Sequence, residues 1–175
     1  MEKTVSSQQI YAGKIIKLRL DEVELQNGML AKREVVEHPG AVAILAVNAD
    51  GEAFFVRQFR KAIEKELLEI PAGKLDAGEE ADACAIRELA EEIEMMADEM
   101  RCIAIFYSSP GFASEKLYIY LATGLRPVAV EKPPDELLET FRLPLRDAVG
   151  MARHGKIEDG KTLIALLLTA DILGL

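Results

Sequence analysis

Apolar and polar residues alternate along the first part of the chain, which is the period of a β-strand with one buried face. Residues 14–25 alternate in this way, and residues 29–37 follow after Asn27 and Gly28. This dipeptide favours a tight hairpin turn because both of its residues tolerate positive φ. We therefore expect a two-stranded antiparallel ribbon. Such a ribbon is marginally stable alone, so it must pack against the rest of the chain or against a second subunit.

The remainder of the chain mixes strand and helix patterns. A continuous apolar run at residues 41–47 is typical of a strand that is covered on both faces. Shorter strands are expected at residues 52–59, 67–70, 101–106, 116–122 and 139–143. Helical periodicity is found at residues 79–94, 145–154 and 160–173. Strands interleaved with helices predict an α/β fold in which helices flank a mixed sheet. The expected organisation is a β ribbon at residues 1–40 and a main domain at residues 41–175.

The first predicted helix is strongly acidic. At about 100° per residue, Glu88, Glu91 and Glu92 fall together beside an apolar face formed by Ile86, Leu89, Ala90 and Ile93. Like charges at this spacing destabilise an isolated helix, and Arg87 offsets only one of them. The cluster is either a solvated helix surface or an oxygen-ligand site for a hard divalent cation. The bare pattern alone favours the solvated surface.

Composition narrows the classes of function. The formal net charge of −9 makes nonspecific attraction to nucleic-acid phosphates unexpected. No apolar run approaches the roughly 20 residues that span a bilayer, and the N-terminus lacks the pattern of a signal peptide. Cys84 and Cys102 are too few for a disulfide framework, so we expect both to be small buried residues. A cytoplasmic protein without a nucleic-acid or membrane partner is the expectation.

The loop that precedes the acidic helix changes the balance between the two interpretations. Gly73 is followed by five residues, Glu79, seven residues and then the run R-E-L-A-E-E-I-E-M, which ends at Met95. This segment resembles the Nudix box, G-x5-E-x7-R-E-U-x-E-E-x-G-U, in which U is a bulky aliphatic residue. Every defining position matches except Glu94, where the family has glycine. Because glycine there supplies a left-handed helix cap, Glu94 must adopt that conformation, at a cost of about 1 kcal/mol, or the helix must continue.

The resemblance implies a Nudix-type α/β/α sandwich and a magnesium-dependent pyrophosphate hydrolase. It implies that Glu88 and Glu92 are the principal Mg²⁺ ligands, that Glu91 shares a further ion, and that the carbonyl of Ala72 completes the set. Mn²⁺ is the alternative metal, and two or more ions per site are expected. Among these ligands, Glu91 and Glu92 are the ones expected to be catalytic. Glu79 and Arg87 are expected to tie the loop to the helix.

Segments outside the box resemble the ADP-ribose pyrophosphatase branch of the family. These are residues 69–75 before the box and residues 106–111 after it, where Pro110 lies about fifteen positions beyond the box, as in that branch. In that branch the N-terminal strands exchange between subunits, so residues 1–40 are the expected dimerisation element of a homodimer. The resemblance implies that substrate contacts come from Arg33, Glu34, Arg57, Arg60 and Glu115. It places the general base on a later loop, where Glu136 is favoured and Asp135 and Glu139 are its rivals.

Three functions follow from this resemblance. The first is hydrolysis of ADP-ribose to AMP and ribose 5-phosphate. The second is the same reaction on another nucleoside diphosphate sugar, such as GDP-mannose or ADP-glucose, because residues 14–16 lack the aromatic side chain that some relatives stack on adenine. The third is a non-catalytic domain that binds a nucleotide sugar. Such a domain is expected to have lost the metal carboxylates, which this chain retains.

Overall fold

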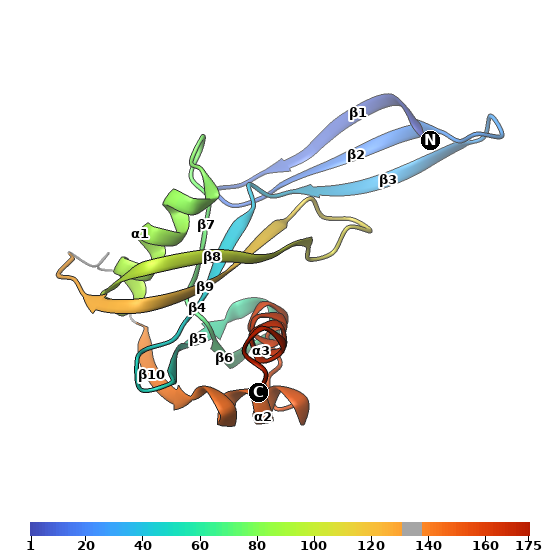
Figure 1. The fold of residues 1–175 in the computed structure, drawn as a ribbon. Helices are drawn as coiled ribbons and strands as arrows, with labels where there is room; N and C mark the ends of the chain where they lie inside the picture. Colours follow the sequence, from blue (N-terminus) through green and yellow to red (C-terminus); the bar gives the residue numbers. More distant parts are fainter. Residues whose placement is uncertain (131–137) are drawn as a thin grey trace. The chain divides into compact units, whose positions relative to one another are not determined.

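The computed structural model describes residues 1–130 and 138–175. The strands of the described residues are β1 (Lys3–Ala12), β2 (Lys17–Glu24), β3 (Leu30–Glu37), β4 (Ala41–Ala46), β5 (Glu52–Arg60), β6 (Lys65–Glu69), β7 (Ala72–Lys74), β8 (Met95–Tyr107), β9 (Lys116–Pro127) and β10 (Glu139–Pro144). The helices are α1 (Ala81–Ile93), α2 (Leu145–Arg153) and α3 (Gly160–Leu173), with a 3₁₀ turn at Lys61–Ile63 (Figure 1). The two predicted C-terminal helices and all predicted strands are therefore present.

The chain divides into two compact units, and the first contains residues 1–40 and 106–117. Its main element is an antiparallel sheet in the order β1-β2-β3 (Figure 1). The expected ribbon thus gains a third strand, β1, which has no alternation of apolar residues to reveal it. All ten residues of β1 are exposed, so main-chain pairing with β2 rather than burial holds this strand.

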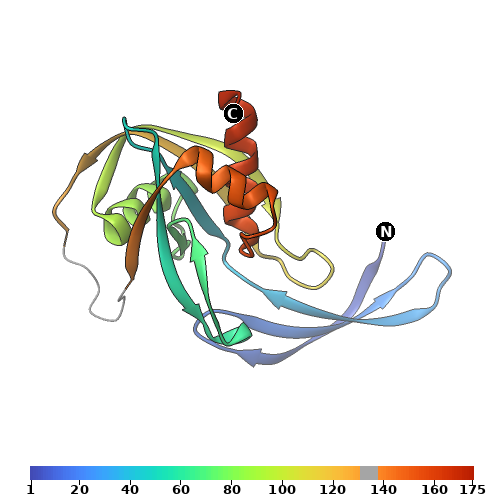
Figure 2. The ribbon, with the colours of Figure 1, turned by 90° about the horizontal axis from the view of Figure 1, so that it is seen from below.

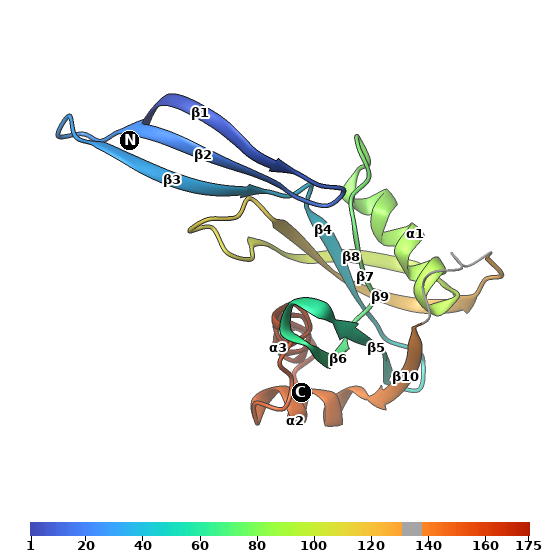
Figure 3. The same ribbon diagram turned by 180° about the vertical axis from the view of Figure 1, so that it is seen from behind.

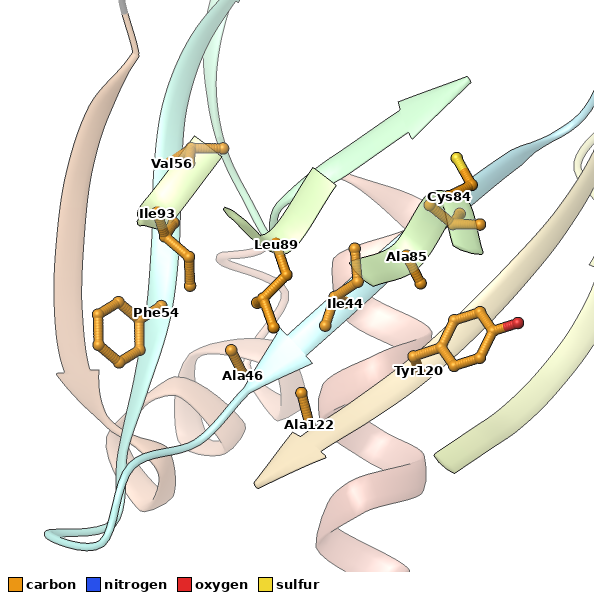
Figure 4. Packing of buried hydrophobic residues seen from close by; sticks show 11 residues of the cluster. Ile44, Ala46, Phe54, Val56, Cys84, Ala85, Leu89, Ile93, Tyr120 and Ala122 are labelled. Atoms are coloured by element: carbon orange, nitrogen blue, oxygen red, sulfur yellow. The ribbon is translucent and has the colours of Figure 1, made fainter. Parts of the chain in front are cut away.

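The second unit contains residues 41–105 and 118–175 and is built around two sheets. One has the order β7-β4-β9-β8 and the other the order β10-β5-β6 (Figure 3). All six residues of β4 are buried, as predicted for a strand covered on both faces. Helix α1 packs against β4 and β7, whereas α3 packs against β4 from the other side and against α2 (Figures 2 and 4). This is the layered α/β arrangement that the sequence predicts.

The core beneath α1 shows how that helix is turned. Leu89 projects from α1 toward Ile44 and Ala46 on β4, and Ile93 lies beside Phe54 on β5 (Figure 4). Ile86, which was expected to face the sheet, is 53% exposed, so that expectation is wrong. The buried arc of the helix also includes Cys84, Ala85, Glu88 and Glu92. The helix is therefore rotated toward its glutamate side, which moves Ile86 into solvent.

Two further details distinguish the structure from the sequence expectations. Cys84 is buried as predicted, but Cys102 on β8 is exposed, so the expectation for Cys102 is wrong. The loop expected after Pro71 begins with the short strand β7, whose Gly73 pairs with Val42 of β4. No helix in the described residues is long and apolar enough to cross a membrane.

Candidate active site

The carboxyl group of Glu88 lies against Gly73 of β7, in a space that exists only because residue 73 has no side chain. The Glu88 residue is 7% exposed although it carries a carboxyl group. A Cβ atom built on Gly73 would lie 1.8 Å from both Cδ and Oε1 of Glu88. The carboxyl group of Glu88 therefore occupies the space that any side chain at position 73 would fill. This contact explains why the first position of the motif is glycine.

Glu92 lies one turn further along α1 and is equally buried, at 7% exposure. Its Oε2 atom accepts a hydrogen bond of 3.0 Å from the backbone amide of Ala72. Glu88 and Glu92 are thus both directed at β7, one at Gly73 and the other at Ala72. A buried carboxylate is costly unless it is paired or coordinates a cation, so two of them in one place require an electrostatic partner.

Arg87 supplies part of that partner charge. It binds Glu79 through two hydrogen bonds of 2.9 Å each, from Nε and Nη2, which is the tie between loop and helix that was expected. Its Nη1 atom donates to Glu88 at 2.6 Å and to Glu91 at 3.0 Å. The hydrogen bonds from Arg87, followed by one from the Asp76 amide, lower the pKa of Glu79 to about 2. The same contacts, that with Glu79 first, raise the pKa of Arg87.

Glu94 ends the helix in the conformation that the family's glycine normally supplies. Its φ of 56° and ψ of 40° are left-handed, and its amide donates to the carbonyl of Ala90 at 3.0 Å. The replacement of glycine therefore leaves the cap in place and adds backbone strain. Neither Glu88 nor Glu92 depends on this position, because both lie before the cap.

The donor set suits a hard divalent cation. Glu88, Glu91 and Glu92 offer carboxylate oxygens, the ligand type that Mg²⁺ and Mn²⁺ prefer, and Glu88 and Glu92 lie next to the main chain of β7. Among the described residues, no three acidic, cysteine or histidine side chains converge as a ready-made metal site. In this arrangement Glu88 and Glu91 are turned onto Arg87, and Glu92 is turned onto the Ala72 amide. The residues fit the ion by the chemistry of their oxygen donors and by the position of Glu88 and Glu92 beside β7.

Two of the expected substrate-binding residues lie on β5 of the same unit. Arg57 lies over the ring of Phe141 at 4.4 Å, and its Nη1 is 3.6 Å from Oε2 of Glu139, both on β10. Arg60 binds Glu69 through Nε and Nη2 at 2.6 and 2.5 Å. Glu139, a rival for the general base, is therefore already an ion-pair partner of Arg57.

The other expected substrate-binding residues belong to the first unit. Arg33 binds both carboxylate oxygens of Glu2, which lies just before β1, and Glu34 is exposed on β3. Glu115 accepts a hydrogen bond of 2.5 Å from Ser108, and its Oε1 lies 3.8 Å from Nδ1 of His38. The favoured base Glu136 and its rival Asp135 lie outside the described residues.

Sequence reasoning missed one cluster of charged residues beside this site. Glu69 is 1% exposed and binds both Arg60 and Lys161, which reaches it from the start of α3. The available signal was a charged residue between the apolar residues Leu68 and Ile70, in a segment predicted to be a short strand. A charge at such a position implies an oppositely charged partner elsewhere in the chain.

Two family models and several curated relatives match this chain. A family model described as NUDIX domain matches residues 37–166, and one described as nucleoside diphosphate sugar hydrolase N-terminal domain matches residues 2–36. The chain is 44% identical over 167 residues to the ADP-ribose pyrophosphatase of Bacillus subtilis (strain 168), covering 94% of this chain and 90% of the relative. It is 42% identical over 167 residues to a methanol dehydrogenase activator of Bacillus methanolicus, with the same shares covered.

Relatives of lower sequence identity also match the chain. A GDP-mannose pyrophosphatase of Citrobacter koseri is 34% identical over 145 residues, covering 77% of this chain and 75% of the relative. A crystal structure described as an ADP compounds hydrolase aligns with a TM-score of 0.87 at 22% identity, covering 99% of this chain and 94% of that one. This structural likeness confirms the predicted α/β fold. Together with the family model that covers most of the chain, the identities show that the chain is a member of the Nudix hydrolase family.

Proposed function

We propose that this hydrolase is a cytoplasmic, magnesium-dependent enzyme that cleaves ADP-ribose to AMP and ribose 5-phosphate. The observation that carries the proposal is the pair of buried glutamates, Glu88 and Glu92, directed at β7 beside Gly73. A solvated acidic helix face would leave these side chains exposed. The relative of highest identity reported above is called an ADP-ribose pyrophosphatase, which supports the choice of substrate.

The proposed metal ligands are Glu88, Glu91, Glu92 and the carbonyl of Ala72, and Mg²⁺ or Mn²⁺ is the proposed ion. Two or more bound ions would neutralise the diphosphate and lower the pKa of a bound water. Glu91 and Glu92 would hold these ions at the reacting centre. Arg87 keeps Glu88 and Glu91 in place from the helix side, since its Nη1 atom contacts both.

Substrate binding is proposed for Arg57 and Arg60 on β5 and for Arg33, Glu34 and Glu115 in the first unit. Arg60 donates to Glu69 through Nε and Nη2, and no hydrogen bond from its Nη1 is found among the described residues. The Nη1 group is therefore suited to donate to a phosphate oxygen. The arginines offset the net charge of −9, which would otherwise repel an anionic substrate.

Glu136 is the proposed general base, with Asp135 and Glu139 as alternatives. The base takes a proton from water while the water oxygen bonds to phosphorus and the bridging P–O bond breaks. Of these, Glu139 lies among the described residues, where its Oε2 is 3.6 Å from Nη1 of Arg57.

A homodimer that forms through the N-terminal strands is part of the proposal. Strand β1 is exposed along its whole length and carries Val5, Ile10 and Tyr11, each more than half exposed. An exposed sheet of this kind with apolar side chains is suited to pair with or pack on a second copy. The match of residues 2–36 to a separate N-terminal family model supports their treatment as a distinct element.

The second candidate is hydrolysis of another nucleoside diphosphate sugar, which the GDP-mannose pyrophosphatase among the relatives favours. The deciding experiment measures nucleoside monophosphate released from ADP-ribose, GDP-mannose and ADP-glucose with Mg²⁺ or Mn²⁺. The highest kcat/KM for ADP-ribose supports the proposal. A higher kcat/KM for GDP-mannose or ADP-glucose shows that the preferred substrate is that sugar nucleotide instead. Absence of turnover across the panel refutes the hydrolase and favours a domain that only binds nucleotide sugars.

A further inference from the structure

A buried carboxylate anchors the arginine that is proposed to bind phosphate. Glu69 ends β6 and is 1% exposed, whereas the side chain of Arg60 beside it is 39% exposed. The two are joined by hydrogen bonds of 2.6 and 2.5 Å that use both carboxylate oxygens of Glu69. A bidentate pair of this type fixes the plane of the guanidinium group. Glu69 therefore determines where the remaining donors of Arg60 point.

Lys161 holds the same carboxylate at Oε2, the oxygen that also accepts from Nη2 of Arg60. Its ammonium group bonds to Oε2 of Glu69 and, at 2.9 Å, to Oδ1 of Asp159. The Lys161 side chain is 11% exposed and that of Asp159 13%, so the bridge between the two carboxylates is largely removed from water. Asp159 is itself fixed, because its Oδ2 caps α3 by accepting from the Thr162 amide at 3.0 Å.

Helix α3 and the end of β6 are joined by a second bond. The hydroxyl of Thr162 accepts from the Ile70 amide at 2.9 Å and donates to Asp159 at 2.5 Å. Thr162 is completely buried, so this bond is protected from exchange with water. The first turn of α3 thus bonds to two consecutive residues, to the side chain of Glu69 at the end of β6 and to the amide of Ile70, which follows the strand.

The charges in this cluster balance only when Lys161 is present. Arg60 and Lys161 carry two positive charges against the two negative charges of Glu69 and Asp159. Burial by itself raises the pKa of Glu69, but the contacts with Arg60 and Lys161 outweigh it and lower that pKa. Without Lys161, the two largely buried carboxylates have only one neighbouring guanidinium, which bonds to Glu69 and not to Asp159. Glu69 is then expected to change its position or its protonation, and the geometry of Arg60 with it.

We propose that Lys161 is a positioning residue that sets the phosphate-binding geometry of Arg60 by fixing Glu69. This inference rests on the proposed function, since it takes Arg60 as a substrate contact. Lys161 does not act on the reacting atoms in this scheme. Its loss should therefore weaken substrate binding more than it slows the chemical step.

The test compares full-length wild type with Lys161→Met, Lys161→Arg and Lys65→Met. Lys65 is the matched control, because it is an exposed lysine whose ion pair with Glu158 lies at the surface. For each protein, KM and kcat are measured with the preferred sugar nucleotide, and metal-free binding of that nucleotide is measured by calorimetry in EDTA. If Lys161→Met does not fold, Lys161→Gln takes its place, because its amide retains a donor without the charge.

Lys161→Met is expected to raise KM and the metal-free dissociation constant about tenfold, with kcat changed less than about threefold. Lys161→Arg should recover most of this loss, and Lys65→Met should stay within about twofold of wild type. Unchanged KM and binding in a folded variant, or a loss confined to kcat, overturns the inference while leaving the hydrolase intact. A wild type that cleaves no sugar nucleotide refutes the proposed function first, and the inference with it.

Discussion

Gly73→Ala is the substitution whose effect follows most directly from the structure. The added Cβ would lie 1.8 Å from Cδ and Oε1 of Glu88 and 2.3 Å from Oε2, whereas ordinary contacts begin at 3.4 Å. The carboxyl group must therefore retreat by about 1.6 Å, the difference between 3.4 and 1.8 Å, or β7 must move away from β4. Misplacement of a reacting or ligating group by about 1 Å costs about 100-fold in rate.

The expected result is a fall in kcat/KM of at least about 100-fold, equivalent to about 2.7 kcal/mol of transition-state stabilisation. A higher Mg²⁺ concentration should be needed for half-maximal activity, because a proposed ligand has moved. Overpacking of this kind also lowers the free energy of unfolding by about 1–3 kcal/mol. The assay is therefore run at 25 °C on protein shown to be folded, with released AMP as the signal and Mg²⁺ varied.

Gly150→Ala is the matched control for this experiment. Gly150 lies within α2, and a Cβ built there meets no described atom within 4 Å. The same chemical change should stabilise the protein by about 0.5–1 kcal/mol and leave kcat/KM unchanged. If Gly73→Ala keeps activity within about threefold of wild type and an unchanged Mg²⁺ dependence, the role assigned to Glu88 is refuted.

Three further outcomes are expected. Glu136→Gln should lower kcat by about 100-fold or more and leave the Mg²⁺ affinity, measured by titration, unchanged. An unchanged kcat would indicate that Asp135 or Glu139 is the general base. Glu94→Gly should relieve a left-handed φ of 56° and stabilise the protein by about 1 kcal/mol, raising Tm by about 2–4 °C; a lower Tm contradicts this. Because Arg87 lowers the folded-state pKa of Glu79 from 4.5 to about 2, the stabilisation from this carboxylate is complete above pH 4.5 and is lost toward pH 2. Glu79→Gln should therefore show a smaller fall of Tm over that range than wild type, and an equal fall argues against the pair.

Much of the fold was predictable, because strands and helices with one buried face leave a period in the sequence. The buried run of β4 and the limits of α3 are examples in which the pattern and the structure agree. Strand β1 was not predictable in this way, since none of its residues is buried and its side chains follow no period. Its position depends on main-chain pairing with β2, which side-chain patterns do not encode.

The candidate site was predictable as a set of residues but not as an arrangement. Spacing placed Glu88 and Glu92 on one helix face, yet it did not predict that this face is buried while Ile86 is exposed. The rotation of α1 depends on packing against β4 and β7, which are distant in sequence. The contact between Glu69 and Lys161 was missed for the same reason, because the two residues are 92 positions apart.

Direct detection of a bound ion tests the central claim, that the glutamates of α1 and the main chain of β7 form a divalent cation site. Mn²⁺ is titrated into wild type, Glu92→Gln and Glu99→Gln, and the free ion is followed by electron paramagnetic resonance. Glu99 is an exposed acid on β8 and serves as the control. The account predicts binding by wild type and Glu99→Gln, with at least about tenfold weaker binding by folded Glu92→Gln. Equal Mn²⁺ affinity in all three proteins, or none in wild type, would contradict it.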